Sequence, residues 1–260
     1  NVEADIVGVF TNAVPPDAYR GAGRPEATHV IERMVDILAA ELKMDPAEIR
    51  LKNFPSKDAF PFPTATGLMY DSGDYAAPLH RALQMVDYTG TRAKQRALRG
   101  QGRYLGIGLS TYGEICAFGP SPATPAGGWE SATVKVEPTA KVTILTGASP
   151  HGQGQETSFA QLAADAFGVS LDDVVVLHGD TDVVQYGIGT FGSRGTAVGG
   201  TAVYLALQDL RAKCTRYAAH MLGVKPAEVT FEGGVFSTSK STKTLSFGEV
   251  ALEAHICRNL

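Results

Sequence analysis

The feature that most constrains this chain is the concentration of glycine in its second half. Eleven of the 29 glycines lie between Gly147 and Gly200. Glycine is favoured where the backbone takes a positive φ or passes close to a ligand. Two segments, 146–157 and 179–200, carry ten of these glycines, and a third loop, 12–26, combines Pro, Gly and two arginines. Irregular loops longer than about 12 residues are usually functional, so we expect these three to bind a ligand.

Composition excludes several classes of protein. Charged residues make up 19% of the chain and hydrophobic residues 44%, which predicts a folded protein with a sizeable core. The net charge of −4 provides no basic surface for nucleic acid. No apolar stretch approaches the roughly 18 residues of a membrane span. Three distant cysteines, Cys116, Cys214 and Cys257, argue against a disulfide framework and predict a cytoplasmic protein.

The apolar pattern predicts an α+β fold in which helices pack on largely antiparallel or mixed sheets. Apolar stripes and caps predict helices at residues 25–42, 46–53, 74–98, 159–167 and 196–222. Residue patterns predict strands at 1–10, 104–112, 131–136, 141–145, 174–177 and 229–231. Of these, 131–136 and 141–145 are expected to form a hairpin.

The Pro- and Phe-rich stretch 57–67 is the best internal boundary, which predicts one domain at 1–66 and another at 67–260. The chain starts inside a predicted strand and ends inside a helical stretch after Gly248. We therefore expect a fragment of a longer polypeptide, with the first domain truncated at its N-terminus and the second at its C-terminus.

Two of the Gly-rich segments are predicted to lead directly into helices. Gly152-Gln153-Gly154 follows a strand, and Ser193-Arg194-Gly195-Thr196 precedes the helix at 196–222. Backbone N–H groups at a helix start bind anions, so the two segments together suit a ligand that contains a pyrophosphate.

Motifs of other enzyme classes are weak or missing in the sequence. A nicotinamide-binding fingerprint needs a third small residue where Thr157 stands, and no ATPase P-loop occurs. The six histidines show no paired ligand spacing, so we predict no metal held by protein side chains. No nucleophile elbow or Cys–His pair is evident. Without an acid–base pair, a cofactor is expected to supply the chemistry.

Four segments, taken in order, resemble one enzyme family. They are residues 18–26 (AYRGAGRPE), 45–54 (DPAEIRLKNF), 151–157 (HGQGQET) and 179–196, which begins GDTD and ends GSRGT. Together they resemble the molybdenum-binding large subunit of the xanthine dehydrogenase, aldehyde oxidase and carbon monoxide dehydrogenase family. The resemblance spans nearly the whole chain.

The resemblance implies a fold of the molybdopterin-binding type and oxidation of an aldehyde or N-heterocycle, with water as the oxygen source. It implies molybdopterin cytosine dinucleotide as the cofactor of this subunit. It also implies an iron–sulfur subunit with 2Fe–2S clusters and an FAD subunit as partners, together with the remainder of the large subunit. The intact enzyme is then expected to be a dimer of heterotrimers.

The resemblance also assigns roles to site residues. Gly152, Gln153 and Gly154 are expected to hold the pterin. The dinucleotide phosphates are assigned to the run Ser193, Arg194, Gly195 and Thr196. Arg20, in a turn with Tyr19 and Gly21, is expected to face the molybdenum. The family's general-base Glu lies in a stretch that this chain does not contain, so the chain alone is expected to be inactive.

Two positions depart from well-known members of the family. In copper-dependent carbon monoxide dehydrogenases, the turn that resembles this one contains a Cys that holds copper. This chain has Gly21 at that position, so we expect negligible CO turnover. Purine oxidisers carry a Phe near the position of Ala22.

The residues alone leave a second hypothesis open, a non-catalytic nucleotide-binding module that uses the two Gly-rich loops at helix N-termini.

Overall fold

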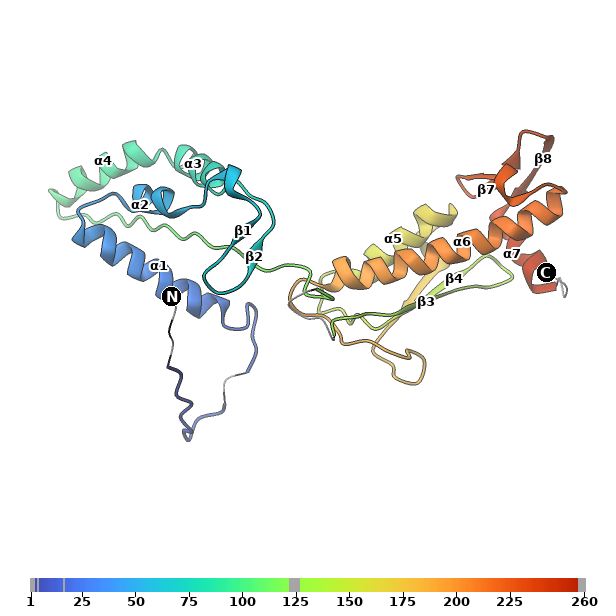
Figure 1. Ribbon diagram of the computed structural model, residues 1–260, viewed down its shortest axis with the longest axis horizontal. Helices are drawn as coiled ribbons and strands as arrows, with labels where there is room; N and C mark the ends of the chain where they lie inside the picture. Colours follow the sequence, from blue (N-terminus) through green and yellow to red (C-terminus); the bar gives the residue numbers. More distant parts are fainter. Residues whose placement is uncertain (1–2, 4, 16, 122–126, 257–260) are drawn as a thin grey trace. The chain divides into compact units, whose positions relative to one another are not determined.

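Figure 1 shows the computed structural model, which describes residues 3, 5–15, 17–121 and 127–256. The chain divides into two compact units, Asn1–Glu114 and Ile115–Leu260. Helices and small antiparallel or mixed sheets build both units, so the predicted α+β class is confirmed. The domain boundary predicted between residues 66 and 67 falls inside the first unit and stays a prediction.

Where it is described, the first unit consists of helices and one very short antiparallel ladder. Its elements are α1 (Arg24–Glu41), α2 (Pro46–Asn53), a 3-10 turn (Lys57–Ala59), β1 (Phe62–Pro63), β2 (Met69–Tyr70), α3 (Ala76–Met85) and α4 (Tyr88–Arg99). The predicted cap of α2 is present, because Asp45 accepts a hydrogen bond from the Ala47 N–H at 2.7 Å. Pro46 occupies the first turn, where its missing N–H costs nothing.

Three predictions for the first unit are wrong over its described residues. The helix predicted over 74–98 is interrupted, because Asp87 adopts a left-handed backbone with φ 41° and its carboxylate accepts from the Gly90 N–H. This residue ends α3 and caps α4. Residues 5–10 and 104–112 form no strand, because no described segment pairs with them. The remaining positions of the strand predicted at 1–10 include residues 1, 2 and 4, which lie outside the described residues.

The apolar stripe predicted on α1 is largely uncovered among the described residues. Val30, Ile31 and Met34 are 60%, 61% and 58% exposed. The helix packs on α2, and the buried side chains of α1 are Glu32 and Ala39. The apolar face of α1 is therefore available for contact with further protein.

The described part of the second unit, 115–121 and 127–256, contains two three-stranded sheets and three α-helices. Its elements are β3 (Ala132–Val136), β4 (Val142–Thr146), α5 (Gln155–Phe167), a 3-10 turn (Leu171–Asp173), β5 (Val174–Leu177), a π-helical turn (Gly195–Gly200), α6 (Thr201–Leu222), a 3-10 turn (Pro226–Glu228), β6 (Thr230–Glu232), β7 (Val235–Thr238), β8 (Ser241–Ser246) and α7 (Phe247–Ile256).

The first sheet of this unit is mixed, in the order β3-β4-β5, and the second is antiparallel, in the order β6-β7-β8. β3 pairs with β4 as the predicted hairpin, and β5 adds to β4 in the parallel sense. Helix α6 packs on β3, and α5 packs on β5 and on α6 (Figure 1). The core between them includes fully buried Ile144, Phe159, Phe167 and Val203.

Most elements of the second unit follow the prediction. The helices at 159–167 and 196–222 are present as α5 and α6, although the second begins with the π-helical turn. β6 differs from the predicted 229–231 by one residue. β7 and β8 are absent from the prediction, because polar Ser, Thr and Lys residues dominate that stretch and hide the apolar alternation.

Candidate functional site

The two Gly-rich segments follow neighbouring strands of one sheet. β4 and β5 run parallel, with Leu145 opposite Leu177 near their carboxyl ends. Ligands of open α/β sheets bind outside these carboxyl ends. The segment 147–154 leads from β4 into α5, and the segment 178–194 leads from β5 into the π-helical turn. Both segments therefore start from the same edge of the sheet.

The start of α5 offers unpaired backbone donors. Gly154 is the N-cap residue with φ 78°, Gly152 has φ 97°, and no side chain of a described residue caps the helix. These φ values favour glycine, and a Cβ at either position would meet nothing within 4 Å. An uncapped, exposed helix start binds anions through its N–H groups. This segment can therefore hold a phosphate or the polar edge of a ring.

Two glutamines connect this helix start with the second segment. The Gln153 amide donates to Oε1 of Gln155 at 2.9 Å, and the Thr190 hydroxyl donates to the same oxygen at 3.3 Å. Gln155 is 3% exposed, and its Nε2 has no hydrogen-bond partner within the described part of the chain. Buried donors are normally paired, so this amide suits an acceptor oxygen of a bound ligand. A Cβ at Gly195 would stand 2.0 Å from that nitrogen.

Arg194 is fully buried and directs its guanidinium into the protein. Its Nε donates to the Phe118 carbonyl at 2.9 Å, its Nη1 donates to Glu130 and to the Gly189 carbonyl, and its Nη2 donates to the Gly128 and Trp129 carbonyls. All five guanidinium donors are used in this way. The Arg194 N–H donates to the Phe191 carbonyl. Arg194 thus has no donor left for a phosphate, and its geometry supports a positioning role instead.

Glu130 is the acidic partner of Arg194 and is a site residue that the sequence analysis missed. Both side chains of this ion pair are fully buried. Oε1 of Glu130 also accepts from the N–H groups of Ile188 and Gly189, each at 3.1 Å. Glu130 therefore joins the segment before β3 to the segment after β5. A single Glu before a strand carries no sequence signal for this role.

The other oxygen of Glu130 lies where two glycines meet. A Cβ at Gly147 would stand 2.3 Å from the Gly187 Cα and 2.5 Å from Oε2 of Glu130. The two backbones can approach only because neither residue has a side chain. Beside them is a cavity of about 460 Å³ lined mainly by small and polar residues, namely Gly147, Ser149, Gly179, Asp180, Thr181, Val184, Gln185, Tyr186, Gly187, Ile188 and Gly189.

Ser193 and Thr196 are exposed beside this buried pair. Ser193 has φ 55°, and its carbonyl accepts from the Ala117 N–H at 3.3 Å, which fixes the loop against the segment after residue 114. Neither hydroxyl donates to or accepts from another described residue. Both hydroxyls are therefore available to a ligand at the start of the π-helical turn.

The turn predicted to face a metal lies in the first unit. The Ala22 N–H donates to the Tyr19 carbonyl at 2.6 Å, and Gly21 has φ 95°. Tyr19 and Arg20 are exposed. The Gly-rich segments lie in the second unit, so a shared role of Arg20 and these segments at one metal stays a prediction. Within the described ranges, no group of three or more His, Cys, Asp or Glu could hold a metal ion.

Family models identify the chain directly. A model described as a molybdopterin cofactor-binding domain matches residues 81–259, and a second model with the same description matches residues 1–54. The chain belongs to this family. It is a molybdopterin cofactor-binding chain, and the resemblance to the molybdenum-binding large subunit that was stated from the sequence is confirmed.

Relatives of this molybdopterin-binding chain include two named enzymes. The carbon monoxide dehydrogenase large chain of Hydrogenophaga pseudoflava is 39% identical over 96% of this chain and 32% of the relative. The nicotine 6-hydroxylase large subunit of Paenarthrobacter nicotinovorans is 32% identical over 95% of this chain and 31% of the relative. The chain thus spans about a third of the length of these curated relatives.

Solved structures support the same fold. Quinoline 2-oxidoreductase from Pseudomonas putida 86 matches with a TM-score of 0.78 and 33% identity, over 91% of this chain and 31% of that one. A Cu,Mo-CO dehydrogenase matches with a TM-score of 0.76 and 34% identity, over 90% and 31% of the two chains. In the described residues of this molybdopterin-binding chain, no helix is long and apolar enough to cross a membrane.

Proposed function

We propose that this chain holds molybdopterin cytosine dinucleotide in an enzyme that oxidises an aldehyde or N-heterocycle, with water as the oxygen source. One observation carries the proposal: two exposed Gly-rich segments leave the same edge of the β4–β5 pair, and the unpaired Gln155 amide lies where they meet. Uncapped helix N–H groups and a buried amide donor fit a ligand with phosphate and ring oxygens.

In this proposal different residues hold different parts of the cofactor. Gly152, Gln153 and Gly154 hold the pterin through backbone N–H groups and the Gln153 amide. Ser193, Gly195 and Thr196 hold the phosphates through hydroxyl and backbone groups. Buried Arg194 and Glu130 do not contact the cofactor and hold the segment 178–194 in place. The bound cofactor supplies the redox chemistry, and the general base comes from the part of the polypeptide outside these residues, so the chain alone is inactive.

The substrate class rests on Gly21 and on the names of the relatives. Glycine has no thiolate to bind copper, a soft ion that prefers sulfur, so copper-dependent CO oxidation is not supported. Two similar proteins are named for oxidising the N-heterocycles nicotine and quinoline. We therefore propose an aldehyde or N-heterocycle as substrate, FAD and 2Fe–2S clusters on partner subunits, a dimer of heterotrimers and a cytoplasmic location. In this arrangement Arg20 lies in the turn that faces the molybdenum.

The test uses the full-length subunit, produced with its native partner subunits. Molybdenum is measured in the purified complex, and the nucleotide released by acid is identified. We expect molybdenum and CMP in equal amounts, and loss of both in the double variant Gln153→Ala, Thr196→Val. Ser241→Ala, on an exposed strand position, is the control. If the folded complex contains neither molybdenum nor CMP, and binds NAD more tightly than CMP in calorimetry, the result supports the nucleotide-binding module instead.

Substrate class is tested with the same complex by dye reduction. Aldehydes and N-heterocycles are expected to reduce the dye, whereas CO is not, and copper is expected to be absent. Gly21→Cys is expected to gain no CO activity, because neighbouring residues Ala22 and Gly23 also differ from the copper-binding turn. CO oxidation by the unmodified complex at one copper per molybdenum contradicts this assignment.

A further inference from the structure

Residues 104–113 of the first unit have the form of a strand without belonging to a sheet. The chain has no helix, turn or bend there and runs as an extended trace (Figure 1), and half-buried Leu105, Ile107 and Leu109 alternate with exposed Gly106 and Gly108. A period of two is typical of a strand with one face on a core. The segment therefore has the side-chain pattern of a strand, and what it lacks among the described residues is a ladder partner.

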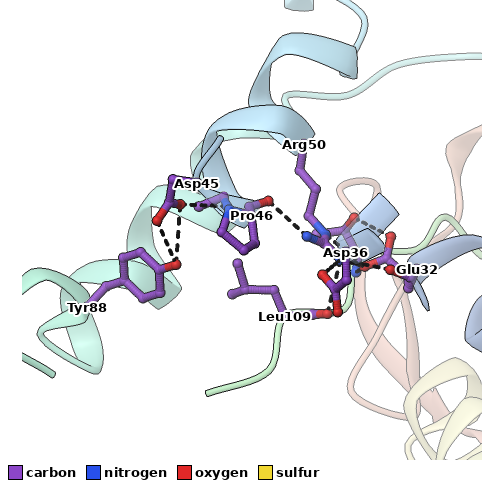
Figure 2. Close-up of polar contacts among 9 residues, drawn as sticks. Glu32, Asp36, Asp45, Pro46, Arg50, Tyr88 and Leu109 are labelled. Atoms are coloured by element: carbon purple, nitrogen blue, oxygen red, sulfur yellow. Dashed lines mark hydrogen bonds and ion pairs between the residues drawn. The ribbon is translucent and has the colours of Figure 1, made fainter. Parts of the chain in front are cut away.

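One edge of this segment is held by buried side chains from the helices (Figure 2). The Arg50 guanidinium donates to the Leu109 carbonyl at 3.3 Å, and the Glu32 carboxylate accepts from the Thr111 N–H at 2.9 Å. Arg50 is also paired with Glu32 at 2.9 Å and with Asp36 at 3.0 Å. Because Arg50 and Glu32 are nearly inaccessible to solvent, this cluster fixes the segment firmly against α1 and α2.

The opposite edge of the segment is open. Backbone groups of successive strand residues point to opposite edges, and the bonded groups belong to odd-numbered residues, including the Leu105 carbonyl, which accepts from the Gln95 amide at 2.7 Å. The N–H and C=O groups of Gly106, Gly108, Ser110 and Tyr112 make no hydrogen bond to any described residue. Residues 104–113 include no charged residue and no Pro, the features that usually protect an exposed edge.

An apolar groove runs along the same segment. A cavity of about 880 Å³ is lined by residues 106–113 and by aromatic and aliphatic residues of the first unit, including Tyr70, Tyr75, Leu79, Leu83 and Val86. The combination of an open strand edge and an apolar groove is the arrangement to which an extended chain segment adds as a new strand.

We propose that residues 104–113 pair with a β-strand from the part of the same polypeptide that lies outside these 260 residues. The chain spans about a third of its relatives' length, so most of such a polypeptide is available to supply it. An uncharged edge and a large apolar groove suit permanent cover, as in a protein core, better than a transient partner. The added strand is expected to place alternate apolar side chains in the groove.

Hydrogen exchange of the full-length subunit in its native complex tests the open edge. The amides of Gly106, Gly108, Ser110 and Tyr112 are expected to exchange about 100-fold more slowly than exposed loop amides such as Gly67. Ser110→Pro removes one donor and is expected to speed exchange at Gly108 and Tyr112 about 10-fold, the effect of one lost hydrogen bond. Ser110→Ala keeps the donor and is the control. Loop-like exchange at all four amides overturns the proposal.

Photo-crosslinking identifies the occupant even if the proline variant does not fold. A photo-crosslinking amino acid replaces Ser110 in the full-length subunit, and the products are mapped by mass spectrometry. We expect links within one polypeptide to residues beyond this chain's 260. Links to another subunit or to a second copy of the same chain overturn the choice of occupant. Neither result depends on which substrate or dinucleotide the enzyme uses, so the test is independent of the proposed function.

Discussion

Glu130 and Arg194 form a charged pair that lies entirely inside the second unit. We expect Glu130→Gln to lower the free energy of unfolding by about 3–5 kcal/mol, because it leaves the buried guanidinium without a counter-charge. Denaturant unfolding of the full-length subunit measures the change. Glu137→Gln, whose partner Lys135 is exposed, is the matched control and is expected to have no measurable effect. Equal effects of the two variants contradict the positioning role of Glu130.

Cys214 gives a pH dependence at the residue scale. Burial raises the pKa of its thiol from 9.0 to about 11. The folded state favours the neutral thiol. The contribution of this thiol to the free energy of unfolding is therefore fully present below pH 9 and is lost as the pH rises from 9 to 11. Stability is expected to fall by about 2–3 kcal/mol relative to Cys214→Ala over that window. Denaturant unfolding at several pH values measures the difference. If the free energies of unfolding of the native protein and of Cys214→Ala change in parallel between pH 9 and 11, this prediction is contradicted.

At the scale of elements, one carboxylate connects two helices of the first unit. Asp45 caps α2, and the Tyr88 hydroxyl of α4 donates to its Oδ2 at 3.0 Å (Figure 2). We expect Asp45→Ala to destabilise the protein by about 1–2 kcal/mol through the lost cap. Tyr88→Phe removes only the second contact and is expected to cost about 1 kcal/mol. Thermal melting compares the variants, and a larger effect of Tyr88→Phe contradicts the assignment.

Local sequence signals predicted most helices and the hairpin, because these depend on nearby residues. Asp45 and Pro46 mark the start of α2, and Gly168 and Gly223 stop α5 and α6. No Gly or Pro stands at Asp87 or directly beside it, so the sequence pattern predicted one continuous helix in place of α3 and α4. Residues 104–112 show the alternation of a strand, but a pattern cannot supply the partner that a strand requires.

The candidate site was predictable only in part, for the same reason. Gly152 and Gly154 stand out because glycine marks unusual backbone. The resemblance singled out Arg194 but implied a phosphate contact, whereas its guanidinium donors all go to Glu130 and to backbone carbonyls, most of them in a distant loop. Glu130 lies 64 residues before Arg194, and no local pattern links two residues so far apart.

At the scale of the whole molecule, the exposed face of α1 predicts association. Val30, Ile31 and Met34 are adjacent on this helix and mostly exposed, and contiguous apolar patches favour protein contacts. We expect the isolated 260-residue chain to self-associate at micromolar concentration in analytical ultracentrifugation. Met34→Glu is expected to reduce association without lowering the melting temperature, because the side chain is not buried. A strictly monomeric chain contradicts this prediction.

The Glu130–Arg194 pair also sets an order of events during synthesis. Glu130 leaves the ribosome 64 residues before the cation that neutralises it. At translation rates of about 5–20 residues per second, the carboxylate waits about 3–13 s for its partner. Until Arg194 emerges, the buried carboxylate has no counter-charge, and the Arg194 bonds to the Gly128, Trp129 and Gly189 carbonyls are missing. We therefore expect the molybdopterin cofactor to be loaded after translation of this region, when the Arg194 contacts that fix these loops are complete.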